Sequence, residues 1–162
     1  MNFPKNDFSS VQQPLKILLE GNEVTWKSFW DVVGELKPKH FTYKHPNIEH
    51  RTISAMVNHA LDAHYSFFTL SLLHEKKYKP LKLVSPKNSS QAQKNIATVY
   101  KKIVKDWMKL TDKQLKKKYK TDWGAVLKGD MVIFEAINHA YYHLSEICFV
   151  RGLGGFPTKL MG

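Results

Sequence analysis

The chain has 162 residues, of which 43% are apolar, and carries a formal net charge of +11. This length suits one domain with a substantial core, and no apolar run reaches the roughly 18 to 20 residues that span a bilayer. Cys148 is the only cysteine, which excludes internal disulfides and any multi-cysteine zinc or iron–sulfur site. We therefore expect a single domain over residues 1–162, with histidine as the main nitrogen or sulfur ligand available to a metal.

The N-terminal segment MNFPKNDFSSVQQP has neither the apolar stretch nor the small-residue cleavage site of a secretory signal, so we expect a cytoplasmic protein. A first helix follows, because apolar residues recur at spacings of three and four from Leu15 to Leu36. Asn22 interrupts this stripe. A polar residue at such a position either makes a local hydrogen bond or faces an internal cavity.

Residues 38–49 carry two prolines and no helical period, which predicts a crossing loop. A second helix is expected from about Arg51 to Lys77. Its segment NHALDAHYSFF holds two candidate metal ligands, His59 and His64, which are five residues apart and cannot share a helix face. His64 lies on the apolar stripe and His59 on its flank, so periodicity alone favours His64 as the buried histidine.

Residues 79–90 contain two prolines, break the helical pattern and supply capping residues for a third helix, whose apolar stripe runs from Ile96 to Leu110. Thr111 and Asp112 then open a short, basic helix. The following segment, TDWGAVLKGD, is expected to be an irregular connection. No alternation of apolar and polar residues is long enough to predict a strand.

The last helix is expected from Met131 to about Arg151, with Asp130 as its N-cap. It contains His139 and His143, and two residues four apart on a helix project from the same face. Both fall beside the main apolar face, on a flank that meets a neighbouring helix in a bundle. The pair has metal-chelating geometry, but a tight site requires a third donor.

Residues 76–128 hold sixteen lysines and three acidic residues, whereas the rest of the chain holds nine basic and eleven acidic residues. Such a segment can attract nucleic acid, an anionic membrane surface or an acidic small molecule, or it can be a solvated helix face. Arginine, whose forked guanidinium group suits base recognition, occurs only at Arg51 and Arg151. We therefore expect neither nucleic acid nor a membrane as partner, and the charge is compatible with a small acidic substrate.

Four amphipathic helices joined by long connections predict an all-α bundle. Three segments resemble the DinB-like superfamily, which includes the bacillithiol and mycothiol S-transferases: MVNHALDAHYSF, HAYYHLSEI and, between them, MKLTDKQLKKKYKTDWG. The resemblance covers nearly the whole chain and implies a four-helix bundle of up-down-down-up topology with long connections, often a homodimer. It also implies a metal triad of His59, His139 and His143, so that His59 replaces His64 as the third ligand.

Three neutral imidazoles favour a divalent ion such as zinc or nickel and leave coordination positions open for water or substrate. The resemblance therefore implies a metal-dependent enzyme. Such an enzyme would be a thiol S-transferase that uses a low-molecular-weight thiol, or a related hydrolase. The alternative is a non-enzymatic stress-response or small-molecule-binding bundle whose metal site is structural or vestigial.

The chain departs from the family pattern directly after the second histidine of the last helix. Where the family has Arg-Gly-Gln, this chain has Leu144, Ser145 and Glu146. Glu146 is either a partner that orients an imidazole or an ordinary exposed carboxylate. Cys148 is expected to be a buried small hydrophobe rather than a nucleophile. Further residues are candidates to touch a ligand, namely Asn22, Tyr141 and Tyr142. Four histidines are assigned no role: His40, His45, His50 and His74.

Overall fold

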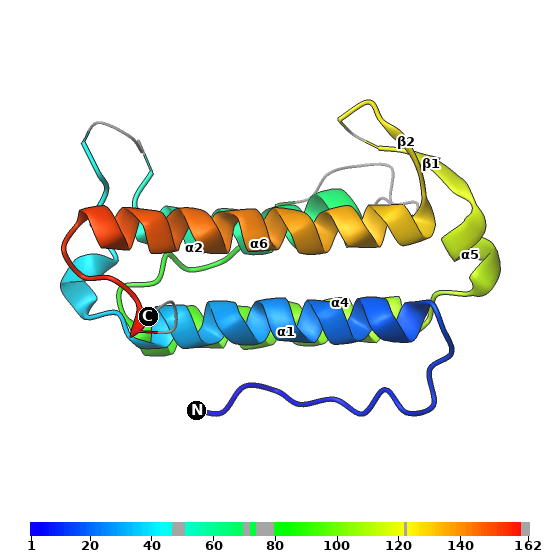
Figure 1. Cartoon of the computed structure of the whole chain (residues 1–162), viewed down its shortest axis with the longest axis horizontal. Helices are drawn as coiled ribbons and strands as arrows, with labels where there is room; N and C mark the ends of the chain where they lie inside the picture. The colour runs from blue at the N-terminus through cyan, green and yellow to red at the C-terminus, as the bar shows by residue number, and fades with distance from the viewer. Residues whose placement is uncertain (47–50, 70–71, 74–79, 122, 160–162) are drawn as a thin grey trace.

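The computed structural model describes residues 1–46, 51–69, 72–73, 80–121 and 123–159. Within them the long elements are helices that lie side by side along one common direction (Figure 1). Their bounds are α1 Leu15–Gly34, α2 Ile53–Ala63, α4 Ser89–Trp107 and α6 Gly129–Leu153. The predicted all-α four-helix bundle is therefore confirmed. No helix in the described ranges is both long and apolar enough to cross a membrane.

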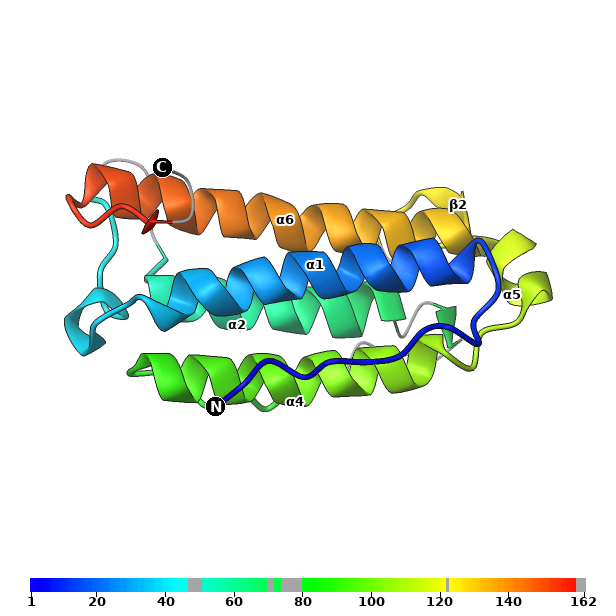
Figure 2. The same cartoon turned by 60° about the horizontal axis from the view of Figure 1, so that its bottom comes forward.

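The four helices form a ring in which each one packs against two others. α1 contacts α4 and α6, and α2 contacts the same two helices from the other side. Figure 1 shows α2 and α6 in one layer and α1 and α4 in the other, and Figure 2 shows the same bundle turned about its long axis. The core between them holds large side chains that are fully or almost fully buried, including Trp26, Phe29, Tyr100 and Trp107. Burying aromatic rings of this size is a main source of stability in a chain of this length.

The second predicted helix changes its hydrogen-bond pattern part of the way along. It begins at Ile53, where the Thr52 side chain accepts a hydrogen bond from the Ala55 N–H, and it stays α-helical to Ala63. A π-helix, η2, then continues it from His64 to Thr69. Segments of π-helix often occur at functional sites, because the extra residue per turn changes where the following side chains point. The predicted end of this helix, at Lys77, lies outside the described residues.

Two short strands follow the short helix, contrary to the expectation of an irregular connection. The predicted helix at Thr111 and Asp112 is confirmed as α5 Asp112–Lys116, which has Thr111 as its N-cap. β1 Lys118–Lys120 then pairs antiparallel with β2 Val126–Lys128. Strands of three residues are too short to show an alternating pattern in the sequence, which explains why they were not predicted. The turn between them uses Gly124 at a φ of +89°, a conformation that favours glycine.

The last helix begins one residue earlier than its predicted N-cap. Lys128 is the N-cap, α6 begins at Gly129, and Asp130 lies in the first turn. The prediction that Asp130 caps this helix was therefore wrong. The Asp130 carboxylate instead accepts from the N–H of Met131, the next residue, inside the first turn. The helix start packs closely against α5, because a Cβ atom on Gly129 would lie 2.4 Å from the Gln114 carbonyl oxygen.

The predicted crossing loop after α1 contains one short 3₁₀ turn, η1 Pro38–His40. At the same end of the bundle (Figure 1) the C-terminal residues are tied down by Arg151, which is almost fully buried. Its guanidinium group donates to the Val32 carbonyl oxygen at 2.9 Å and to the Glu35 carboxylate at 2.7 Å. This contact joins the end of α6 to the end of α1, and so fixes the position of α6, the helix that carries His139 and His143, against the core.

Candidate metal centre

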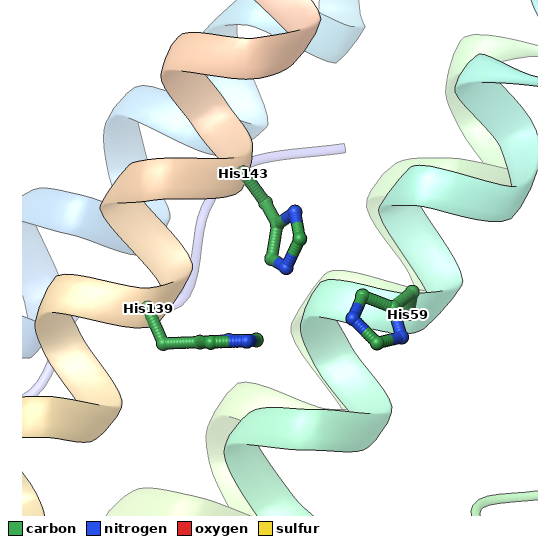
Figure 3. Close-up of side chains that lie close together, drawn as sticks. All are labelled: His59, His139 and His143. Carbon is green, nitrogen blue, oxygen red and sulfur yellow. The ribbon is translucent and has the colours of Figure 1, made fainter. Parts of the chain in front are cut away.

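His59, His139 and His143 converge in the space between α2 and α6. Figure 3 shows the three imidazoles pointing toward one another, with one from α2 and two from α6. One ring nitrogen of each lies within 4.8 Å of the other two. Within the residues described, these are the only three histidine, cysteine or acidic side chains grouped in this way. The structure thus brings together the set that the family resemblance implies.

The spacing fits one ion after a small closure of the side chains. Zinc–nitrogen bonds of about 2.1 Å separate tetrahedral ligands by roughly 3.4 Å. The nitrogens of the triad therefore need to approach by no more than about 1.4 Å to share one ion, and rotation of the imidazoles can supply this. His143 is buried, His139 is half-buried and His59 is the most exposed of the three, so the group opens toward solvent on one side.

The protonation of the triad suits a metal ligand. Burial lowers the pKa of His139 to about 4, with smaller contributions from His143, His59 and Arg51. Burial, followed by the charge of Arg51, also lowers the pKa of His59. Both imidazoles are therefore neutral at pH 7 and have a lone pair available for an ion.

One buried atom of the triad supports the same fit. The Nδ1 atom of His139 is buried and makes no hydrogen bond within the described part of the chain. Leaving a buried polar atom without a partner is costly, and a metal ion that took the lone pair of this nitrogen would offset the cost. The donor set, its charge state and its spacing therefore fit a divalent ion of the zinc type.

Glu146 is a hydrogen-bond partner of the triad rather than an ordinary exposed carboxylate. Its Oε2 atom lies 2.7 Å from Nδ1 of His143, one helical turn earlier on α6. Its Oε1 atom lies 3.7 Å from the Arg51 guanidinium group. A carboxylate bonded to one ring nitrogen sets the tautomer of the histidine and leaves Nε2 as the ligand atom. Of the two roles open from the sequence, the structure supports the orienting one.

His64 is a core residue outside the triad. It is fully buried, and burial lowers its pKa to about 3, so the ring is neutral. The indole of Trp26 meets its ring edge-on and that of Trp107 stacks on it, at centroid distances of 5.4 and 5.3 Å. The prediction from periodicity that His64 is the buried histidine is confirmed, while His59 is the one that faces α6.

Other residues singled out in the sequence lie in different places. Asn22 is fully buried, and neither of its side-chain polar atoms makes a hydrogen bond within the described ranges. Tyr141 and Tyr142 are exposed, and only Tyr142 borders the triad, with its ring 5.2 Å from that of His143. Cys148 lines a separate groove between α1 and α6, and burial raises the pKa of its thiol. His50 and His74 lie outside the described residues.

A pocket of about 470 Å³ opens beside the triad. It is bordered by two of the three histidines and by mostly aromatic or small side chains from α2, η2, α6 and the turn between the strands: His59, Ala63, Phe68, Trp123, Glu135, Asn138, His139 and Tyr142. Sequence reasoning missed Phe68, Trp123 and Glu135 as pocket residues. The positions of Phe68 and Trp123 depend on the π-helix and on the hairpin, neither of which has a local sequence signal. Glu135 could have been found, because it lies four residues before His139 and shares its helix face.

Comparison with solved structures shows the same fold in proteins of very different sequence. YfiT from Bacillus subtilis, described as a probable metal-dependent hydrolase with an unusual four-helix bundle topology, matches with a TM-score of 0.69 and 16% identity over 96% of each chain. The mycothiol-dependent maleylpyruvate isomerase matches with a TM-score of 0.57 and 12% identity. That match covers 88% of this chain but 63% of the isomerase, so this chain spans less than two thirds of that enzyme.

A mutant of the same isomerase matches with a TM-score of 0.55 and 13% identity. No protein-family model matches the chain, and no curated protein matches it. At these identities the structural likeness establishes the fold, and it confirms the bundle that the resemblance to the DinB-like superfamily implies. The order of helix directions within the bundle stays a prediction.

Proposed function

We propose that this chain, which has the fold of a probable metal-dependent hydrolase and of a mycothiol-dependent isomerase, is a metal-dependent enzyme. In this proposal His59, His139 and His143 hold one divalent ion, with zinc or nickel as the preferred metals. The observation that carries it is the convergence of three ring nitrogens within 4.8 Å at the edge of a pocket.

When bound, the ion would lower the pKa of a coordinated thiol or water and so supply a nucleophile at neutral pH. The protein residues have separate roles around it. Glu146 holds the His143 ring in one orientation through the 2.7 Å hydrogen bond. Burial keeps His139 neutral, and His59 stands at the open side, where a ligand enters from the pocket. Three protein ligands leave room for one more donor.

The reaction we propose is transfer to or from a low-molecular-weight thiol, or a related hydrolysis. The thiol dependence of one structural neighbour and the hydrolase description of another support these two reactions. The thiol of Cys148 is not beside the triad, because it lies in a different groove. We further propose one cytoplasmic domain over residues 1–162 that acts as a homodimer.

The second candidate is a non-enzymatic stress-response or small-molecule-binding bundle with a structural or vestigial metal. Structural zinc sites usually fill all four positions with protein ligands. The group found in the described residues has three. This observation favours the enzyme over the structural site.

The test is activity with defined metal content. Protein loaded with zinc or nickel is assayed for conjugation of a generic electrophile with bacillithiol, mycothiol, glutathione and coenzyme A, and for hydrolysis of a generic ester. We expect one of these activities to require metal and to be lost in His139→Ala, but to be kept in His40→Ala, where the changed histidine stacks on Phe156 outside the triad. Rates that do not depend on metal, or that His139→Ala keeps, would reject the metal-dependent mechanism, and no rate with any of these substrates would leave simple binding.

A further inference from the structure

The pocket beside the triad has an aromatic wall built from two separate elements. Phe68 comes from the π-helix and is buried, whereas Trp123 comes from the turn between the strands and is 46% exposed. Their ring centroids are 4.9 Å apart at an angle of 56°. A pocket of about 470 Å³ is within the roughly 300 to 1,000 Å³ typical of small-molecule sites. Its size and wall suit a flat apolar compound.

The aromatic side chains also reach the histidines. The Phe68 ring lies 5.6 Å from that of His139, and the Tyr142 ring lies 5.2 Å from that of His143. Tyr142 is 62% exposed, although it borders a pocket. Exposed aromatic rings at a concave site are typical of ligand recognition, since a ligand that covers them removes apolar surface from water. A ring held by Phe68 and Trp123 would therefore lie next to the triad.

Glu135 is the charged side chain of this pocket. It precedes His139 by one helical turn on α6 and borders the pocket beside it. Among the described residues, no hydrogen bond or ion pair occupies its carboxylate. In the part of the chain that the structure describes, no lysine of residues 76–128 lines the pocket. The strand lysines Lys118 and Lys128 are exposed to solvent instead. Among the described residues that line the pocket, Glu135 is therefore the one acidic side chain, and no lysine or arginine lines it.

We infer that this pocket selects a flat apolar compound that carries an amino or other cationic nitrogen, with the ring against Phe68 and Trp123 and the nitrogen directed to Glu135. A carboxylate accepts a charge-assisted hydrogen bond from such a nitrogen, and aromatic faces attract cations. A compound with a carboxylate at the same position would meet Glu135 as a like charge. As a substrate pocket this inference rests on the proposed function, but the binding itself requires no metal.

Binding of three matched probes to metal-free protein tests it. The probes are 2-phenylethylamine, 2-phenylethanol and phenylacetate, which share one ring and differ in the charge of the substituent. Affinities are measured by calorimetry or protein-observed NMR. In the wild-type protein we expect the amine to bind about tenfold more tightly than the carboxylate.

Two variants divide the contribution of charge from that of the rings. Glu135→Gln is expected to weaken the amine about tenfold and to change the alcohol less than twofold, and Trp123→Ala is expected to weaken all three probes. The matched controls are Glu20→Gln, an exposed carboxylate on α1, and Phe149→Ala, an exposed ring on α6 outside the pocket lining. Neither control is expected to change any affinity. Circular dichroism confirms that each variant is folded before it is used.

Equal affinity for the three probes, or an amine affinity that Glu135→Gln leaves unchanged, would overturn the inference. Metal content is measured on the same samples before the metal is removed. Selectivity for the amine in a protein that binds no metal would uphold this inference and reject the proposed function. Stoichiometric metal binding without selectivity for the amine would reject this inference and leave the proposed function standing.

Discussion

Removing the Glu146 carboxylate is expected to weaken metal binding without unfolding the protein. The carboxylate holds His143 through a 2.7 Å hydrogen bond. The Glu146 side chain is only 18% exposed, so water has little access to take the place of the carboxylate beside the ring. Loss of a carboxylate that orients a histidine ligand typically costs 10- to 100-fold in metal affinity. In Glu146→Ala we therefore expect a Kd for zinc that is higher by this factor, or about 1.4 to 2.7 kcal/mol of binding free energy.

The assay is a zinc titration in competition with a chromophoric chelator of known affinity. Glu146→Gln serves as the conservative variant, because its amide oxygen can still accept a hydrogen bond from the His143 ring, so it should fall between the wild type and Glu146→Ala. Glu20→Gln changes a carboxylate far from the triad in sequence and on another helix, and it should bind zinc as the wild type does. A Glu146→Ala protein with unchanged zinc affinity would refute the orienting role.

Three further predictions concern stability and assembly. In urea unfolding, Gly129→Ala should lower the free energy of unfolding by about 1 to 3 kcal/mol, because the added Cβ would lie 2.4 Å from the Gln114 carbonyl oxygen. The control Gly152→Ala, whose Cβ would meet nothing within 4 Å, should not lower it, and equal urea midpoints for the two variants would contradict this prediction. Metal-free protein should lose stability as the pH falls from about 6.5 toward 4, because His64 takes up a proton in the unfolded state but stays neutral in the folded state, where its pKa is about 3. His64→Gln should lose less stability over this range, and an identical loss would show that His64 is not the cause. Sedimentation should show a homodimer, and a monomer at high micromolar concentration would remove this expectation.

The helices of the bundle could be predicted because their side-chain spacing carries the information directly. Leu15 to Leu36 and Ile96 to Leu110 repeat at three and four residues, and helices α1 and α4 carry these stripes. The last residue of each stripe, Leu36 and Leu110, lies just after its helix ends. The hairpin could not be predicted, because three-residue strands are stabilised by their pairing with each other rather than by a pattern along the chain. The π-helix at His64 likewise depends on packing, since the Trp107 indole donates to the Thr69 hydroxyl at 3.1 Å.

The candidate site was predictable in part for the same reason. His139 and His143 share a face through their spacing alone, and the structure keeps both at the contact of α6 with α2. The choice between His59 and His64 could not be made from periodicity, because it depends on which neighbour each flank of α2 faces. The core stripe turns His64 toward Trp26 and Trp107, and the flank turns His59 toward α6. Only the resemblance to a family, carried by three segments of the sequence, pointed to His59.

Elemental analysis of the purified protein tests the central claim most directly. The measurement compares three proteins that are expressed and purified in parallel: the wild type, the double variant His59→Ala/His143→Ala, and the control His40→Ala. If the three histidines hold one divalent ion, the wild type and the control should contain about one zinc or nickel per chain, and the double variant should contain none. Equal, stoichiometric metal in the wild type and in the double variant would contradict the claim and place the ion elsewhere.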